Sequence, residues 1–113
     1  MAFKSYESAL RERVAGWIHQ FGSADILIGI PCYNNEDTIG HVIEQAALGL
    51  SRHFPGLRKA ILISDGGSTD DTRVVAEKAV CPEDVRRFIF IYRGLPGKGT
   101  SFRAVFEAAR MMK

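Results

Sequence analysis

Polar residues gather where one apolar run of the chain gives way to glycines. The run 60–64 is followed directly by Asp65, by two glycines and by the polar stretch 68–72. Glycines let the backbone turn tightly, and Ser68 or Asp70 can then cap a following helix. A carboxylate placed at such a turn can accept a hydrogen bond from a ring nitrogen of a pyrimidine or guanine base. The simpler interpretation is that Asp65 and Ser68 only stabilise the turn and cap the helix.

Two further loops carry groups that suit the same kind of ligand. In residues 31–37 (PCYNNED), Tyr33 offers a ring that could lie against a base, and Glu36 a carboxylate suited to ribose or ring N–H groups. In residues 94–100 (GLPGKGT), Lys98 stands between glycines at a helix start, where it could meet a phosphate alongside free amides. Either loop alone could be ordinary capping, with residues 34–37 at the positive end of a helix. Their occurrence after successive strands favours a shared site.

Three apolar runs of strand length must position these loops, at 25–30, 60–64 and 87–92, and Pro31 is expected to end the first. Helical spacing of apolar residues follows over 39–54, 70–79 and from about 102, and an additional amphipathic helix is predicted over 3–21. Strands without polar alternation are typical of parallel sheets covered on both faces. The right-handed crossover rule then predicts an α/β fold with strand order 3-2-1. Its carboxyl edge is where such sheets bind nucleotides.

Composition limits the class of protein. The chain has 113 residues, 46% hydrophobic and 25% charged, which suits one globular domain. A net charge of +2 without a basic stripe argues against a nucleic-acid partner. The two cysteines, Cys32 and Cys81, have no C-x-x-C spacing and suit a reduced, cytoplasmic chain. We expect no transmembrane segment, because no apolar run approaches about 18 residues.

Other site types are excluded by spacing. A Walker A loop ending at Lys98 would need glycine where Tyr92 stands, and Gly99 follows the lysine. The three histidines, at 19, 41 and 53, lack the spacing of a zinc site. Cys32 has no evident base that would make it a nucleophile, and we interpret it as a small space-filling residue.

Three segments in order resemble the nucleotide-binding half of family-2 glycosyltransferases of the GT-A, Rossmann-like fold. Residues 28–39 (IGIPCYNNEDTI) are similar to the I-P-x-Y-N-E-x-x-x-I opening of that family. Residues 63–72 (ISDGGSTDDT) resemble its D-[DG]-G-S-T-D-x-T signature, and residues 97–104 (GKGTSFRA) its G-K-G-x-x-x-R segment. The residues of this last segment and the helix predicted over 3–21 also resemble those of the branch of the family that makes glucosyl- or mannosyl-glycerate.

The resemblance implies a donor site for a UDP- or GDP-sugar. It assigns nucleoside contacts to Pro31, Tyr33, Glu36 and Asp65, and places Lys98 near ribose or phosphate. Cys32 and Gly66, inside the matching segments, complete the expected nucleotide-binding set.

The family's D-x-D motif, which holds a divalent metal (Mg or Mn) on the donor diphosphate, should follow the helix after the G-K-G loop. Residues 1–113 end at Lys113, still inside that helix. We therefore expect the N-terminal half of a longer domain, without catalytic residues or a metal site of its own and inactive in the parent transfer. Strand edges and helix faces left without partners predict self-association. The alternative function is a non-catalytic α/β nucleotide-binding or assembly module.

Overall fold

The computed structural model describes residues 16, 22–92 and 98–112, of which 98–102 are described by their backbone only. The helix predicted over 3–21 falls almost entirely outside these residues. The elements within them are β1 (Ile26–Cys32), α2 (Ile39–His53), β2 (Lys59–Asp65), α3 (Thr72–Lys78), β3 (Val85–Ile91) and α4 (Lys98–Met112). All three strands and the three helices that follow them were predicted from the sequence.

The strands form one parallel sheet in the order β1-β2-β3. This is the predicted order 3-2-1 viewed from the opposite edge, so the predicted α/β fold class is confirmed. In the register of the sheet, Cys32 lies beside Asp65, and Asp65 beside Ile91. The last residues of the three strands therefore lie in one row, and Asp65 is its centre.

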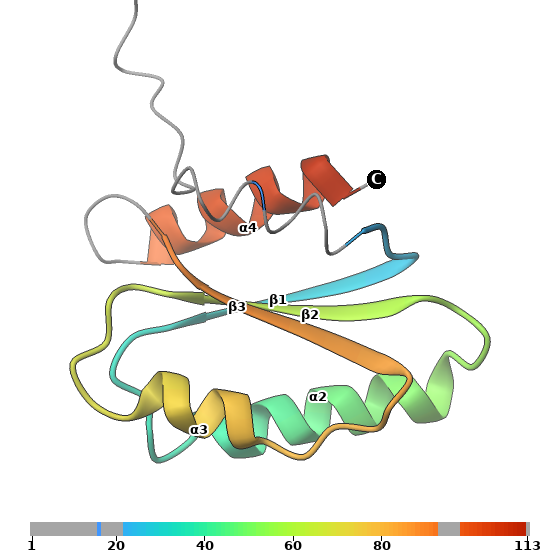
Figure 1. The fold of residues 1–113 in the computed structure, drawn as a ribbon, viewed down its shortest axis with the longest axis horizontal. Helices are drawn as coiled ribbons and strands as arrows, with labels where there is room; N and C mark the ends of the chain where they lie inside the picture. The colour runs from blue at the N-terminus through green and yellow to red at the C-terminus, as the bar shows by residue number, and fades with distance from the viewer. Residues whose placement is uncertain (1–15, 17–21, 93–97, 113) are drawn as a thin grey trace, which may run out of the picture.

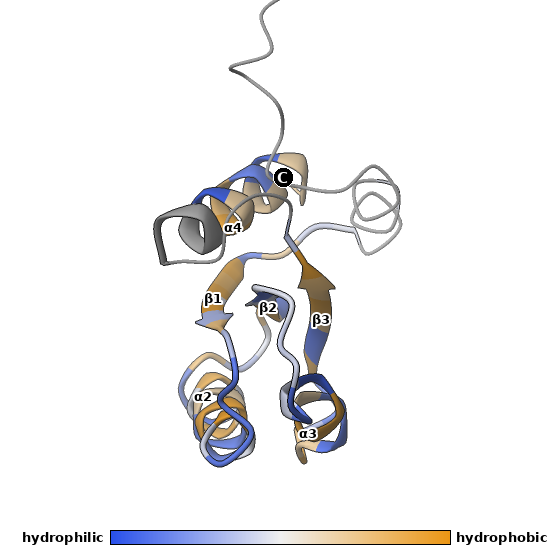
Figure 2. Cartoon of the chain, turned by 90° about the vertical axis from the view of Figure 1, so that its left-hand side faces the viewer, coloured by the Kyte–Doolittle hydropathy of each residue, from blue (hydrophilic) through white to orange (hydrophobic). Residues whose placement is uncertain are grey.

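The helices form two layers with the sheet between them (Figure 1): α4 covers one face, and α2 and α3 cover the other. Every residue of β2 is buried, because it is the central strand and both of its faces are covered. Figure 2 shows the hydrophobic residues of the strands between the helix layers. In the described part of the chain, every helix falls short of the length and apolar character that crossing a membrane requires.

Strand β1 continues through Pro31 to Cys32, so the prediction that Pro31 ends this strand was wrong. The Cys32 carbonyl accepts a hydrogen bond from the Gly66 N–H, which shows that Cys32 directs its backbone groups toward β2. Backbone direction alternates along a strand, so the nitrogen of Pro31 faces away from β2. A proline in that position costs the sheet no hydrogen bond.

Helix α4 packs very closely against β1 at Gly29, which has no side chain. A Cβ placed on Gly29 would lie 2.4 Å from Cγ1 of Val105. Since real Cβ atoms do not approach other atoms this closely, only glycine at this position lets the helix pack where it does.

Candidate functional site

Asp65 ends the central strand and is completely buried. Its Oδ2 accepts hydrogen bonds from the N–H groups of Gly67 (2.9 Å) and Ser68 (2.8 Å), and Nε of Arg73 lies 3.7 Å away. Its Oδ1 accepts from the Ser68 hydroxyl (2.5 Å) and the Cys32 thiol (3.4 Å). Both oxygens thus satisfy donors of the turn itself, which is the simpler of the two roles expected for this residue.

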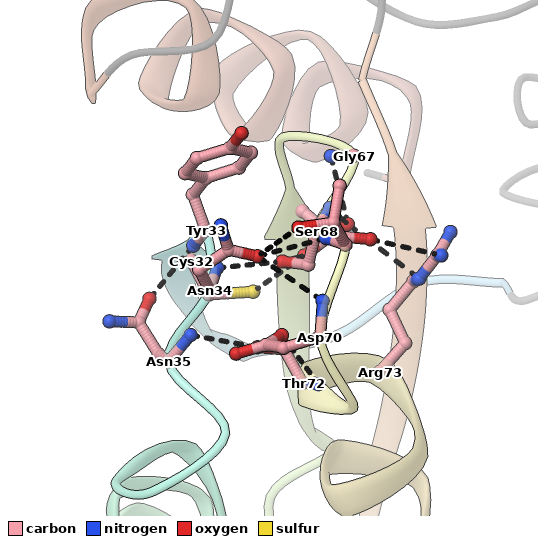
Figure 3. Close-up of polar contacts among 11 residues, drawn as sticks. Cys32, Tyr33, Asn34, Asn35, Gly67, Ser68, Asp70, Thr72 and Arg73 are labelled. Atoms are coloured by element: carbon pink, nitrogen blue, oxygen red, sulfur yellow. Dashed lines mark hydrogen bonds and ion pairs between the residues drawn. The ribbon is translucent and has the colours of Figure 1, made fainter.

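The loop after β1 is bound to the loop after β2 through Asn34. Its Oδ1 accepts hydrogen bonds from the N–H groups of Thr69 (2.9 Å) and Asp70 (3.4 Å), and its own N–H donates to the Ser68 hydroxyl oxygen (2.8 Å). Figure 3 shows these side chains converging between the two loops. Asn34 has a φ of 52°, in the left-handed region that asparagine tolerates better than most residues.

A second set of contacts joins the same loops nearer to α3. The Asn35 N–H donates to the Thr72 hydroxyl oxygen (2.7 Å). The Glu36 carboxylate accepts from the Asp71 N–H (2.9 Å), while the Glu36 N–H donates to Asp70 (3.3 Å). We refer to the bonded residues 34–36, 65 and 67–72 as the loop junction. Its effect is to hold two loops, more than thirty residues apart in sequence, as one unit.

Asp70 satisfies an amide at the start of α3, as expected for one of the two predicted caps. Its carboxylate accepts from both the N–H and the hydroxyl of Thr72, although Asp71 occupies the N-cap position. Burial alone would raise the pKa of Asp70, but the hydrogen bonds from Thr72 and from the Glu36 N–H together lower it below its ordinary value. The carboxylate form therefore stabilises the junction.

Cys32 is buried beside Asp65 and packs with the apolar side chains on the α2 and α3 face. Burial, and secondarily the charge of Asp65, raise the pKa of the Cys32 thiol to about 12. The thiol is therefore protonated near neutral pH and is a poor nucleophile. This agrees with its interpretation as a space-filling residue.

The opposite side of the same edge, toward α4, is organised differently. Tyr33 is 45% exposed, and Figure 3 shows its ring turned away from the bonded side chains of the loop junction. A Cβ placed on Gly66 would lie 3.2 Å from Cδ1 of Tyr33 and 2.6 Å from the hydroxyl oxygen of Tyr92. Tyr92 itself is buried in the cluster under α4. We refer to Tyr33, Gly66 and Tyr92 as the tyrosine cluster.

The remaining predicted site residues lie at the same edge. Pro31 precedes Cys32 at the end of β1, and Lys98 is the first residue of α4, although its side chain lies outside the described residues. The structure therefore brings six of the seven predicted residues together around the ends of β1 and β2. Among the described residues, no group of three or more His, Cys, Asp or Glu side chains is placed to hold a metal ion.

Two residues of the edge were missed from the sequence. For Asn34 the sequence offers only capping, as one alternative for residues 34–37, whereas its side chain accepts hydrogen bonds from the second loop. The sequence predicts Tyr92 only as the last residue of a strand. The signal that could have indicated it is its position directly after Ile91, the residue of β3 that shares a row with Cys32 and Asp65.

Comparison with known proteins agrees with this arrangement. The model of glycosyl transferase family 2 matches residues 27–111, which include both loops and all of α4 except its last residue. A solved structure described as "Crystal Structure of a Mycobacterial Protein" aligns with a TM-score of 0.50 and 24% sequence identity, over 89% of this chain and 30% of that one. That likeness concerns the fold alone, and the present chain spans less than a third of the solved protein's length. The curated proteins gave no match. On the family match, which extends over most of its length, the chain belongs to glycosyl transferase family 2.

Proposed function

We propose that this chain binds the nucleoside diphosphate part of a sugar donor, a UDP- or GDP-sugar, at the carboxyl edge of its sheet. The whole protein to which it belongs would transfer that sugar to an acceptor. The family match supports the general class of reaction. The choice between the two donors, and the narrower resemblance to the glucosyl- or mannosyl-glycerate branch, rest on the sequence motifs alone.

The proposal rests on the contrast between the hydrogen-bonded loop junction and the exposed ring of Tyr33. The loop junction holds the loops after β1 and β2 together, while the Tyr33 ring beside Gly66 remains exposed. An aromatic face on a rigid support is well suited to stack on a planar base, because little side-chain entropy is lost on binding. The exposed Glu36, which is on the same loop, can meet a sugar hydroxyl with the lone pairs that Asp71 leaves unused.

Asp65 has a supporting role in this proposal. Its carboxylate is enclosed by donors from Cys32, Gly67 and Ser68, so direct contact with a base would require some of these bonds to be exchanged. Lys98 at the start of α4 would lie on the diphosphate side, where a cation and free helix amides both favour an anion.

A divalent metal is expected only in the intact parent enzyme. A cytoplasmic location and self-association of this chain stay predictions of the sequence.

The test is a titration of the 113-residue chain with UDP and with GDP, followed by NMR. We expect millimolar binding, about 4 kcal/mol, with shifts of the amide signals of residues 33, 36 and 66. Tyr33→Ala should abolish these shifts. Phe54→Ala is the matched control, because Phe54 is similarly exposed (43%) but lies at the other end of α2.

Loss of the shifts in both variants, or shifts located away from this edge, would argue against the proposed site. If neither nucleotide shifts any signal, the alternative of a non-catalytic assembly module is preferred.

A further inference from the structure

The close contact between Gly66 and Tyr92 has no explanation in the turn itself. The loop junction accounts for Gly67, which has a φ of 87° and donates its N–H to Asp65. Gly66, in contrast, is required by its surroundings, since a Cβ there would lie 2.6 Å from the Tyr92 hydroxyl oxygen and 3.2 Å from Cζ of the same ring. The phenol of Tyr92 therefore occupies the space that any side chain at position 66 would need.

Tyr92 is firmly held in this position. It is 3% exposed and packs with Leu62, Phe90 and the buried side of α4. Its N–H donates to the backbone carbonyl of Asp65 (3.0 Å), so its main chain is fixed to the residue just before Gly66. Because both the backbone and the ring of Tyr92 are held in place, the ring cannot move to make room for a side chain at position 66.

We propose that Tyr92 is a positioning residue of the nucleoside site. By excluding a side chain from position 66, it keeps the backbone of the turn bare beside the Tyr33 ring, so that a planar base can lie along both. This inference rests on the proposed function and extends it to a residue outside the matched loop motifs. The ligand class is a nucleoside diphosphate whose base stacks on Tyr33.

The consequence for position 66 is steric. A Cβ at this position would meet Cδ1 of Tyr33 at 3.2 Å as well as the Tyr92 hydroxyl. Because Tyr92 is buried and Tyr33 is exposed, the Tyr33 ring is the one that has room to move. A methyl group at position 66 would therefore displace the ring on which the base is expected to stack.

The experiment is a double-mutant cycle in the 113-residue chain with Gly66→Ala, Tyr92→Phe and the two combined. Affinities for UDP and GDP and the ring-proton shifts of Tyr33 are measured by NMR. Gly66→Ala alone should weaken binding about tenfold, which lies within the usual range of costs for inserting a methyl group into a packed site. Removing the Tyr92 hydroxyl leaves two contacts at 3.2 Å, with Cζ of residue 92 and with Cδ1 of Tyr33, and each requires a shift of only a few tenths of an ångström. In the Tyr92→Phe background the same change should therefore cost less than about threefold.

Gly49→Ala is the matched control. It introduces the same methyl group on α2, where a Cβ would meet nothing within 4 Å, and should leave both affinities unchanged. The Tyr33 ring shifts distinguish positioning from a purely structural effect, because a loss of stability alone would not move the ring in the folded fraction.

The inference is overturned if folded Gly66→Ala binds as the parent does with unaltered Tyr33 signals, or if the combined variant binds no better than Gly66→Ala. Should Gly66→Ala fail to fold, a combined variant that folds and binds supports the pairing, and one that also fails to fold contradicts it. If the parent chain binds neither nucleotide, the proposed function fails first and this inference with it. A parent that binds, together with an insensitive Gly66, refutes only the role of Tyr92.

Discussion

The two sides of the carboxyl edge use the same strand ends for opposite purposes. Toward α2 and α3, the side chains of Cys32 and Asp65 are buried, and the loop junction forms a closed network of hydrogen bonds. Toward α4, the tyrosine cluster combines a buried ring with an exposed one around a bare glycine. The comparison indicates that one side sets the shape of the edge while the other is available to a ligand. Substitutions on the first side should therefore change stability, and on the second side binding.

The largest effect is expected for Asp65→Ala. It leaves the Gly67 and Ser68 amides and the Ser68 hydroxyl without their acceptor in a buried setting, which should cost about 3 kcal/mol or more. Urea denaturation monitored by circular dichroism measures the loss. Asp71→Ala, an exposed acid of the same loop, is the control and should change stability little. If Asp65→Ala is as stable as the parent, the junction is not the rigid side of the edge.

Two substitutions of Asn34 distinguish the effect of backbone strain from the effect of lost hydrogen bonds. Asn34→Ala loses the bonds to Thr69 and Asp70 and also places alanine at a φ of 52°, so we expect a loss of about 2 kcal/mol. Asn34→Gly loses the same bonds without the strain and should be about 1 kcal/mol more stable than Asn34→Ala. Thermal unfolding of both variants provides the comparison. Equal stabilities would show that the left-handed conformation contributes nothing.

Tyr33→Ala should change stability by less than about 0.5 kcal/mol, because the ring is nearly half exposed and makes no part of the junction. The measurement is the same urea denaturation, with Phe54→Ala as the control of similar exposure. A large loss of stability would place Tyr33 on the structural side and would remove the contrast between the two sides.

The smallest expected effect is the pH dependence of the stability that Asp70 contributes. The folded-state pKa of Asp70 is lowered, so its carboxylate stabilises the fold above its ordinary value of 3.8, and this contribution is lost as pH falls through the lower folded-state pKa. Asp70→Asn should therefore be less stable than the parent at pH 6, and the difference should be smaller at pH 3, below the ordinary value of 3.8. Urea midpoints at the two pH values test this. Asp37→Asn, which changes an exposed acid of the neighbouring loop, is the control variant.

The fold was predictable because its strands are continuous apolar runs and its helices have apolar residues at regular spacing. The exceptions occurred where tertiary contacts override local signals. Strand β3 begins at Val85, two residues before the prediction, and the charged Arg86 in this additional part donates a hydrogen bond to the carbonyl of Ser23. Helix α4 begins at Lys98 despite the glycines around that residue.

The sequence was sufficient to predict most residues of the candidate site, but not how they are arranged. The motifs located Tyr33, Asp65 and Gly66, yet which side of the edge each side chain occupies depends on contacts between residues far apart in sequence. The bonds of Asn34 to the second loop span 34–36 residues, and the contact of Gly66 with Tyr92 joins two strand ends. Such pairs leave no pattern in a single sequence, because asparagine and tyrosine are compatible with many local environments.

The contact of Gly29 with Val105 has a mechanical consequence for the whole edge. Val105 lies seven residues after the first residue of α4, about 10 Å along the helix axis. The helix packs most closely against the strand at this point, so a small tilt of α4 about it would move the amino end of the helix relative to both loops. Substitutions at Gly29, which is not one of the proposed site residues, would then change the position of Lys98 relative to the two loops.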